Sequence, residues 1–481
     1  MNKKDKYQIV IGLEVHAQLL TKSKLFCGDS AAFSTDPNTH ISPVTLAHPG
    51  TLPKMNSKAI EYAITLGLAL DCEIEQYNYF ARKNYFYPDL PKGYQVSQHT
   101  TPICKNGSVP ISINGTDRKI RLNRIHIEED AGKSLHDVDE NYTCIDLNRA
   151  GVPLLEIVSE PDMHSSEEAF AYITELRKLV TWLGICDGNM EEGSMRCDAN
   201  ISIRLAGEKK LGTRVEVKNL NSIRNVKRAI DVEVNRLIEL VENNQPVIQE
   251  TRSYDADNNI TFSLRSKEDA DDYRYFPEPD LTPFQITDDY LVEIRNKLPV
   301  LPNALKKRYI RELQLSDYDA AVICDDKDQA DYFEAVVQHT TNYKAVANWL
   351  LGPVKNQLND RKMWYTNFPL PAEKLALLIS LVDTGTLNFG NASSKVLPVL
   401  IDHPQKQPLQ IATELNLIQE SDSSAVENWV DEVIANMPDK VKQYQLGKKG
   451  LIGLFVGEVK RLSKGKADMQ LVSKFLEQKL K

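Results

Sequence analysis

The chain has 481 residues, 42% of them hydrophobic, and a formal net charge of −9 at pH 7. This length and composition predict about three globular domains with sizeable cores. No apolar run approaches the ~20 residues of a membrane span, and the charged N-terminus leads straight into a strand pattern, so we expect a cytoplasmic protein without a signal peptide or membrane contact. The seven cysteines form no CxxC pair, which disfavours a disulfide framework or a cysteine-rich zinc site.

The sequence pattern changes twice along the chain. Residues 1–293 mix alternating strands with turns and a few helices, residues 294–407 have helical periodicity interrupted by prolines, and residues 408–481 form a final helical module. No internal repeat or low-complexity tract is present.

The first predicted strand covers residues 9–18, IVIGLEVHAQ. Its apolar positions alternate with Glu14, His16 and Gln18, so a strand would place a core face on one side and these three polar side chains on the other. Taken alone, this pattern fits equally the water-facing side of an antiparallel sheet.

Residues 82–95, RKNYFYPDLPKGYQ, place Arg82, Lys83 and Lys92 among tyrosines in a proline-containing loop. Cations among aromatic rings can stack a base and hold a phosphate. The segment DDYRYFPEPD at residues 271–280 has the same character, with Arg274 between two tyrosines. Aromatic packing with surface lysines is the alternative interpretation.

The segment RIHIEEDAGKS at residues 124–134 contains adjacent carboxylates, which must be solvated, paired or neutralised by a cation. In a regular strand Glu128 shares a face with His126 and Glu129 points away, so Glu129 needs a bulge or strand end to reach that face. Oxygen ligands favour magnesium or manganese over zinc. Because Ile127 stands where a P-loop needs glycine, and no GxGxxG occurs, a nucleotide would have to be held by metal, lysine and arginine.

A helix is predicted over residues 165–184, with Ser165 or Ser166 as its cap and Gly184 at its end. Two strands follow. In the first, Asp198, Asn200 and further polar residues alternate with isoleucines, and in the second, residues 214–218, Glu216 and Lys218 alternate with valines. Together with the first strand, they predict a polar face made from distant parts of the chain.

The C-terminal 42 residues, 440–481, contain eleven Lys or Arg against three acidic residues, a net charge of +8 on an otherwise acidic chain. Such a module can neutralise phosphates of a nucleic acid. A solvated helix with surplus lysines is the alternative interpretation of the charge alone.

Seven of these segments, read together and in order, closely resemble the GatB family, the B subunits of tRNA-dependent glutamyl/aspartyl amidotransferases. They are IGLEVHAQLLTKSKLF, LPKGYQVSQ, HIEEDAGKS, DLNRAGVPLLEIVSEPD, MEEGSMRCDANIS, VEVKNLNS and DDYRYFPEPD.

The resemblance implies an α+β fold. A cradle-like, mostly antiparallel sheet domain similar to the glutamine synthetase class would span residues 1–293, a helical domain 294–407 and a small basic helical tail domain 408–481. It also implies a heterotrimer with two partners, an amidase (the A subunit) and a small protein (the C subunit). ATP would phosphorylate the side-chain carboxylate of Glu on glutamine tRNA, or of Asp on asparagine tRNA, and ammonia from the amidase would then displace phosphate.

By position in the matching segments, the resemblance also implies the site residues. The Mg²⁺ and ATP-site ligands would be Glu14, His16, Glu129, Asp198 and Glu216. Lys83 would neutralise phosphate and act with Glu129 in catalysis, and Lys83, Tyr85, Arg149 and Arg274 would bind ATP or substrate. In the tail, tRNA would be held by Lys448, Lys449, Lys460, Arg461 and Lys464.

Two departures from the family pattern stand out. Many relatives have cysteine pairs that bind zinc, whereas Cys27 stands alone here beside the cysteine-free segment SPVTLAHPGTLP, so we do not expect zinc. The tail motif reads VGEVKRLSKG from Val456, which keeps the basic character but changes the usual residues.

Two other functions remain open at this stage: an independent ATP-dependent ligase of a small carboxylic acid, and a non-catalytic RNA-binding subunit with a solvated polar face. The absence of a GxSxG segment disfavours a serine hydrolase.

Overall fold

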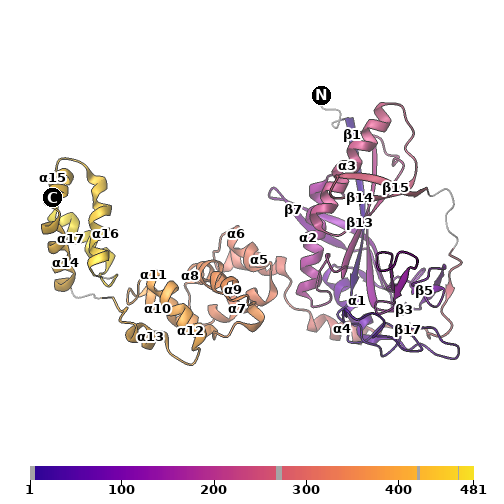
Figure 1. Ribbon diagram of the computed structural model, residues 1–481, viewed down its shortest axis with the longest axis horizontal. Helices are drawn as coiled ribbons and strands as arrows, with labels where there is room; N and C mark the ends of the chain where they lie inside the picture. Colours follow the sequence, from indigo (N-terminus) through magenta and orange to yellow (C-terminus); the bar gives the residue numbers. More distant parts are fainter. Residues whose placement is uncertain (1–5, 267–272, 420–422, 464, 481) are drawn as a thin grey trace. The chain divides into compact units, whose positions relative to one another are not determined.

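The computed structural model describes residues 6–266, 273–419, 423–463 and 465–480 (Figure 1). The chain divides into two compact units, residues 1–301 and 302–481. The predicted boundary between residues 293 and 294 falls inside helix α4 (Asp288–Lys297), which belongs to the first unit. The division into three domains stays a prediction.

The first unit is built on a ten-stranded sheet with the order β15-β14-β13-β12-β1-β11-β8-β6-β2, in which β7 pairs with β8. Neighbouring strands run antiparallel except β13 and β14. The strands of this sheet are β1 (Tyr7–Gln18), β2 (Glu73–Ile74), β6 (Cys104–Lys105), β7 (Ser108–Ile113), β8 (Thr116–Glu129), β11 (Pro153–Ser159), β12 (Met195–Leu205), β13 (Val215–Leu220), β14 (Glu250–Asp255) and β15 (Ile260–Ser266).

Smaller sheets and the helices α1, α2 and α3 also belong to this unit, together with α4. The three-stranded sheet has the order β16-β4-β5, and the pairs β10-β9 and β17-β3 stand apart. These elements are β3 (Tyr77–Asn78), β4 (Ala81–Asn84), β5 (Tyr94–Ser97), β9 (Lys133–Leu135), β10 (Cys144–Asp146), β16 (Phe276–Pro277), β17 (Phe284–Gln285), α1 (Ser57–Ala69), α2 (Ser166–Trp182) and α3 (Ile223–Glu242).

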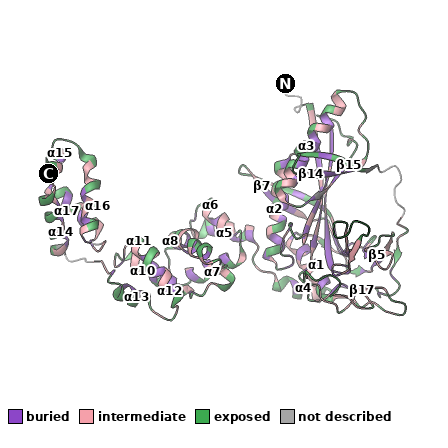
Figure 2. Ribbon diagram, viewed as in Figure 1, coloured by how far each residue is buried: buried purple, intermediate pink, exposed green. Residues whose placement is uncertain are grey.

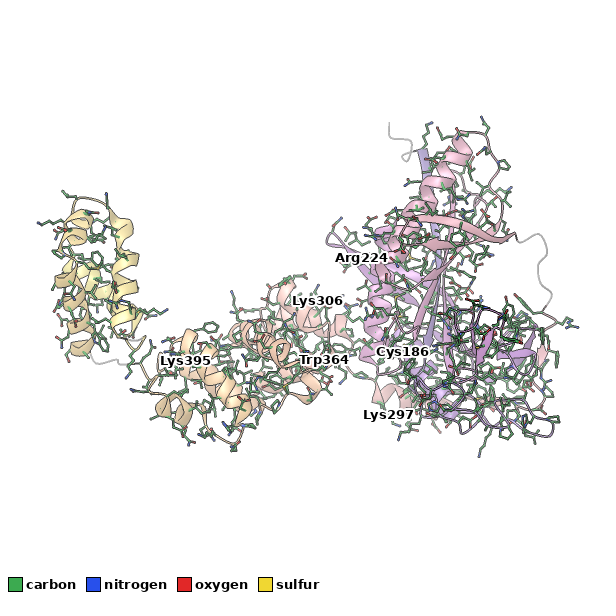
Figure 3. The ribbon with its side chains drawn as sticks, viewed as in Figure 1. Cys186, Arg224, Lys297, Lys306, Trp364 and Lys395 are labelled. Atoms are coloured by element: carbon green, nitrogen blue, oxygen red, sulfur yellow. The ribbon has the colours of Figure 1, made fainter. Side chains whose placement is uncertain are left out.

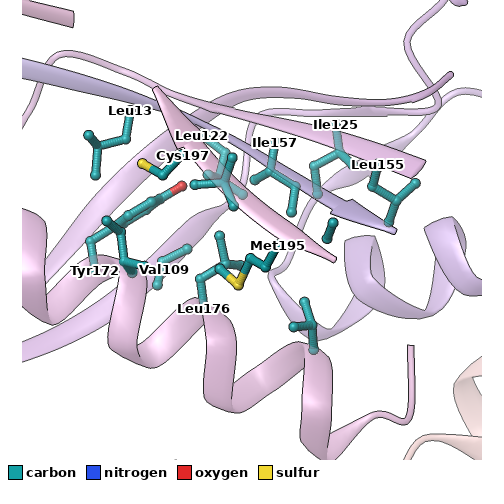
Figure 4. Packing of buried hydrophobic residues seen from close by; sticks show 14 of the residues in the cluster. Leu13, Val109, Leu122, Ile125, Leu155, Ile157, Tyr172, Leu176, Met195 and Cys197 are labelled. Atoms are coloured by element: carbon teal, nitrogen blue, oxygen red, sulfur yellow. The ribbon is translucent and has the colours of Figure 1, made fainter. Parts of the chain in front are cut away.

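The core lies between one face of the main sheet and its helices. On β1, Ile11, Leu13 and Val15 are buried, while Glu14 and His16, at the alternate positions, are only half-buried, as the alternation predicts. Figure 4 shows side chains of this sheet face packed over α2. Buried residues likewise follow the inner strands in Figure 2. The opposite face of the sheet is therefore free to carry polar groups.

Helix α2 confirms the predicted helix at residues 165–184. The Ser165 side chain caps it by accepting a hydrogen bond from the Glu168 amide, and Gly184, with φ +65°, follows its C-terminus. Glu167 and Glu168 lie in the first turn, where their negative charges interact favourably with the positive end of the helix dipole.

The second unit is helical, as predicted for residues 294–407 and beyond. Two π-helical turns, at Leu350–Val354 and Ala392–Val396, interrupt otherwise α-helical segments. Its α-helices are α5 (Pro302–Glu312), α6 (Asp317–Ile323), α7 (Lys327–Val337), α8 (Tyr343–Trp349), α9 (Lys355–Arg361), α10 (Ala372–Asp383), α11 (Phe389–Asn391), α12 (Leu397–Asp402), α13 (Pro408–Glu414), α14 (Ser423–Asn436), α15 (Pro438–Gln445), α16 (Ile452–Leu462) and α17 (Met469–Lys479).

The C-terminal helices have a core of their own. Val430 of α14, Phe455 and Val459 of α16 and Leu476 of α17 are buried in one cluster. Within the described ranges, no helix combines the length and apolar character required to cross a bilayer. The structure thus has a large, mostly antiparallel α+β part followed by a helical part.

Candidate functional site

Five neighbouring strands present polar side chains on the face of the main sheet opposite the core, which we call the polar floor. Pairing aligns Glu14 with Asp198, and places His16 between Glu156 and Arg196. The polar floor comprises Glu14, His16 and Gln18 of β1, Arg124, His126 and Glu128 of β8, Glu156 of β11, Arg196, Asp198 and Asn200 of β12, and Glu216 and Lys218 of β13.

Two groups of candidate cation ligands share one imidazole. Glu14, His16 and Asp198 form the first group, and His16, Glu128 and Glu156 the second, with the ligand atoms of each group within 4.8 Å of one another. The His16 Nε2 atom lies 3.6 Å from Glu14, 3.8 Å from Glu128 and 3.5 Å from Glu156. The structure therefore brings the predicted residues Glu14, His16 and Asp198 together.

Negative charge dominates around His16. Burial alone would lower the pKa of His16, but the neighbouring carboxylates of Glu156, Glu128 and Glu14 outweigh burial and raise that pKa to about 9. Burial, followed by the charge of Glu156, raises the pKa of Glu14. The carboxylates thus attract a proton or another cation to the space between them.

Glu156 lies between two histidines and an arginine. Its carboxylate is 3.5 Å from both the His16 and His126 Nε2 atoms and 3.3 Å from the Arg124 guanidinium. Burial would raise the pKa of Glu156, but His126, His16 and Arg124 hold it well below its usual range. The Nδ1 atom of His126 is buried without a hydrogen-bond partner among the residues that the structure describes.

This donor set fits a magnesium ion. Carboxylate oxygens supply most of the candidate ligands, which suits a hard divalent cation better than zinc. The contacts of 3.5 to 3.8 Å around the His16 imidazole exceed ordinary hydrogen-bond lengths. The arrangement is therefore open enough to accept a cation without breaking short hydrogen bonds to His16.

Glu216 lies at one edge of the polar floor, outside both ligand groups. The Thr251 hydroxyl donates to its carboxylate at 2.9 Å, and the Lys218 ammonium is 3.3 Å away. Lys218 also donates to Asp198. Burial would lower the pKa of Lys218, but Asp198 and Glu216 raise it well above its usual value, so this lysine is a fixed positive charge beside the first group.

The expected position of Glu129 on the polar floor requires correction. β8 stays paired with β11 in regular register through Glu129, so no bulge turns its side chain and Glu128 takes the position on the polar floor. The Glu129 carboxylate instead accepts hydrogen bonds from Lys92 at 2.6 Å and from the Val96 amide at 2.7 Å. The alternation of side chains along a regular strand therefore places Glu128, and not Glu129, on the polar floor.

Lys83, on β4, lies beside the polar floor. Burial would lower its pKa, but the charge of Glu128, together with Tyr275 and Tyr273, raises it. The Lys83 ammonium lies 4.9 Å from the ring centroid of Tyr273 and 5.8 Å from that of Tyr85. The predicted cation among aromatic rings is therefore present next to the carboxylates.

These rings continue as a chain of contacts. Tyr85 packs edge-on against Tyr87 and Tyr273, and Tyr275 stacks on His99 with centroids 4.0 Å apart. Burial, followed by the charge of Glu128, raises the pKa of Tyr85, which keeps its hydroxyl protonated.

The other two residues predicted to bind ATP or substrate, Arg149 and Arg274, make hydrogen bonds within the protein. Arg149 donates to the carbonyls of Ala131 at 2.8 Å and Gly132 at 2.6 Å. Arg274 is exposed with φ +44°, and its carbonyl accepts from Asn84 at 2.8 Å. Their predicted roles in binding remain predictions.

The thiol of Cys27 contacts two neighbours. Its Sγ lies 3.4 Å from both the Asp29 carboxylate and the Thr45 hydroxyl, and Thr45 donates to Asp29 at 2.5 Å. The expectation that this chain does without zinc stays a prediction.

The predicted tRNA-binding residues of the tail are mostly exposed. Lys448, Lys449, Lys460 and Arg461 all face solvent, although Lys449 lies over the Tyr444 ring at 4.2 Å and Arg461 pairs with Glu458 at 2.5 Å. Lys464 lies outside the described residues.

The predicted site residues leave out Glu156 and include Glu129 in place of Glu128, and Lys218 and Lys92, although noted as charged residues, were given no role. Strand parity with His126 favours Glu128, and alternation in VEVK places Lys218 beside Glu216. Glu156 stands in the apolar run LLEIV, where a lone charge is itself a signal, whereas nothing in the sequence pairs Lys92 with Glu129.

Comparisons with known proteins identify the family. The family described as the GatB/GatE catalytic domain matches residues 9–292, and the family described as the GatB domain matches residues 331–480. The chain is 48% identical over 480 residues to a protein of Geotalea daltonii named as the B subunit of aspartyl/glutamyl-tRNA(Asn/Gln) amidotransferase, covering 98% of this chain and 99% of that protein. Proteins of the same name from Geotalea uraniireducens (49% identity over 481 residues, 99% of each chain) and Nitratidesulfovibrio vulgaris (48% over 474 residues, 98% and 99%) are equally similar. With the carboxylates and histidines of its catalytic part assembled on one sheet face, the chain belongs to the GatB family of amidotransferase B subunits.

Proposed function

We propose that this chain is the tRNA-binding and ATP-using subunit of a glutamine-hydrolysing amidotransferase, and that the polar floor is where ATP activates the carboxylate of a misacylated tRNA. The convergence of two ligand groups on His16 supports this most directly. The family name supports glutamyl-tRNA(Gln), aspartyl-tRNA(Asn) or both as substrates. The two partners of the heterotrimer, the amidase and the small C subunit, belong to the same proposal, as does a cytoplasmic location.

The chemistry explains why such a floor is needed. A carboxylate is a poor acyl donor because oxide would have to leave. Transfer of the γ-phosphoryl group of ATP to a carboxylate oxygen releases ADP, and attack by ammonia on the carbonyl carbon then expels phosphate and forms the amide. Phosphoryl transfer depends mainly on positioning and charge neutralisation.

Particular side chains suit each part of this task. Glu14, His16 and Asp198, with Glu128 and Glu156 as the second group, would hold Mg²⁺, which neutralises phosphate charge when bound. Lys83 would contact the transferred phosphoryl group, since it is a cation held beside Glu128. Glu216 would act indirectly by orienting Lys218, and Glu129 by fixing Lys92.

Around this centre, Tyr85, Arg149 and Arg274 would border the bound nucleotide or acceptor end. A cradle-like shape similar to the glutamine synthetase class is part of the proposal. The helical tail, residues 408–481, would bind the tRNA backbone through Lys448, Lys449, Lys460, Arg461 and Lys464, since an exposed basic surface reads the shape of structured RNA.

The test is ATP turnover by the complex assembled with its amidase and small partner proteins, with ammonium chloride as an alternative nitrogen donor. We expect ADP release to depend on Mg²⁺ and on misacylated tRNA, and to match amide formation one for one. ADP release that responds equally to a free carboxylic acid would support the small-molecule ligase instead. Binding of tRNA without any ADP release would support the non-catalytic RNA-binding role.

A further inference from the structure

A cavity of about 500 Å³ adjoins one end of the polar floor. Its lining comes from Gln18 at the end of β1 and residues 19–22 after it, from residues 30–34, from the β9-β10 hairpin and the residues after it, and from the loop between α2 and β12. Its volume lies in the range of small-molecule sites, which run from about 300 to 1,000 Å³.

The cavity and the polar floor share a wall. Gln18, which lines the cavity, follows His16 by two positions on the same face of β1, a separation of about 7 Å along a strand. Its amide donates to Asp130 at 2.7 Å, and Arg196 reaches the same carboxylate at 3.0 Å. An amino acid bound in the cavity can therefore place its side chain next to the cation ligands.

One side of the cavity is a firmly held acidic loop. Cys186, labelled in Figure 3, is buried, and its Sγ accepts from the Gly188 amide at 3.3 Å. The Asn189 side chain then accepts from the backbone amides of Glu191 at 3.0 Å and Glu192 at 3.2 Å. These bonds fix the backbone that carries Glu192 to the cavity.

The charged groups of the lining differ in how far they are already engaged. Asp187 accepts from Ser194 at 3.1 Å, and Asp146 accepts from the Asn38 amide at 3.0 Å. Across the ranges that the structure describes, neither the Glu192 carboxylate nor the Lys22 ammonium has a hydrogen-bond or ion-pair partner. Among the described residues, the cavity thus offers one carboxylate without such a partner, Glu192, and two such ammonium groups, Lys22 and Lys133.

The same cavity has an exposed aromatic ring. Phe33 is 65% exposed, and the Lys133 ammonium lies 5.6 Å from its ring centroid. A large apolar ring left exposed at a cavity mouth, with a cation over one face, is a stacking platform for a nucleobase.

We propose that this cavity receives the aminoacylated 3′-terminal nucleoside of the tRNA, with Glu192 binding the α-ammonium group of the esterified amino acid. This inference rests on the proposed function. Phe33 and Lys133 stack the base, and Lys22 contacts the preceding phosphate. The side-chain carboxylate of the amino acid then points past Gln18 to the polar floor.

The charged groups of the ligand are those of an esterified acidic amino acid, an α-ammonium group and a side-chain carboxylate. Esterification removes the α-carboxylate, so the free α-ammonium is the group that separates an aminoacyl-tRNA from an uncharged one. The Glu192 carboxylate in the cavity matches the ammonium of the residue, and the ammonium groups of Lys83 and Lys218 at the polar floor match its side-chain carboxylate. The cavity therefore selects aminoacylated tRNA and directs the side-chain carboxylate of the amino acid to the polar floor.

The experiment compares free and N-acetylated aminoacyl-tRNA as substrates of the assembled complex, using the acidic aminoacyl-tRNA that the wild-type complex amidates, with ammonium chloride as nitrogen donor. For Glu192→Gln we expect KM for the free-amine substrate to rise about tenfold, as for loss of one charge-assisted hydrogen bond, while KM for ATP is unchanged. The preference for the free amine over the acetylated form should nearly disappear. Glu191→Gln, at an exposed neighbour outside the cavity lining, should behave as wild type.

Glu192→Asp retains the negative charge and should keep most of the preference for the free amine. This variant shows whether the effect of Glu192→Gln comes from the lost charge or from a disturbed loop. A steric penalty on the acetyl group would remain in Glu192→Gln, so an undiminished preference in that variant would overturn the proposal. A wild-type complex that amidates no tRNA at all would instead refute the proposed function.

Discussion

The polar floor and a second cluster of charged residues in the first unit are built in opposite ways. Between α3 and β14, the Glu233 carboxylate is fully buried and accepts from Arg236 at 2.6 Å, and the Glu250 carboxylate accepts from Arg252 at 2.7 Å. Thr261 donates to Glu233 at 2.8 Å and in turn accepts from Arg252 at 3.0 Å. Here two carboxylates meet two guanidinium groups through short hydrogen bonds.

The polar floor has the opposite balance. Glu14, Glu128, Glu156 and Asp198 surround His16, whose contacts to the three glutamates are 3.5 Å or longer. A cluster whose charges are paired within the protein stabilises the fold, whereas one with surplus carboxylates and long contacts is arranged for a cation from outside. The difference separates a structural charge cluster from a functional one.

The largest effect is expected at the polar floor. Glu14→Gln should lower tRNA-dependent ATP turnover roughly 10³-fold, because a ligand of the phosphate-bound cation is lost. The free energy of unfolding should not fall, since the change removes repulsion between Glu14 and Glu156. Turnover assays and urea denaturation, with Glu73→Gln at an exposed position of β2 as control, measure both. Near-normal turnover would remove Glu14 from the site.

The second effect concerns the paired cluster. Glu233→Gln should lower the free energy of unfolding by about 3–5 kcal/mol, because two arginines lose a fully buried counter-charge. Urea denaturation of the chain measures the loss, and Glu239→Gln, at an exposed position of the same helix, is the matched control. Equal stability of the two variants would show that the cluster contributes no more than a surface charge.

The smallest effect is a pH dependence of the same cluster. Burial would raise the pKa of Glu250, but Ser263 and Arg252 hydrogen bonds hold it below its usual value. The stabilisation is therefore present above the unfolded pKa of about 4.3 and is lost as the pH falls through the lower folded value. Glu250→Gln should cost about 1 kcal/mol at pH 7, and the difference should shrink steadily as the pH is lowered below about 4.3. Thermal unfolding across this range tests the direction, and a difference that grew on acidification would contradict it.

Alternation was sufficient to predict much of this site. The positions of Glu14, His16 and Asp198 on one sheet face follow from a period of two in β1 and β12, and the Ser165 cap and Gly184 end of α2 follow from helix-terminus chemistry. The helical nature of the second unit follows from its periodicity.

Partner choice between distant segments could not be predicted in the same way. Whether Glu128 or Glu129 faces the polar floor depends on whether β8 keeps its register to its end, and the reason Glu129 is held elsewhere is Lys92, a residue 37 positions away. Likewise Arg149, expected at the substrate, uses its guanidinium to hold the carbonyls of Ala131 and Gly132. The spacing of residues along the sequence does not predict such contacts between distant segments.

The central place of β1 has a consequence for synthesis. This strand ends at Gln18, but its two neighbours begin only at Pro153 and Met195. At about 5–20 residues per second, a ribosome needs on the order of ten seconds to supply the first of them. Throughout that time the nascent chain displays an unpaired apolar strand, which makes it a natural client for chaperones that shield emerging polypeptides.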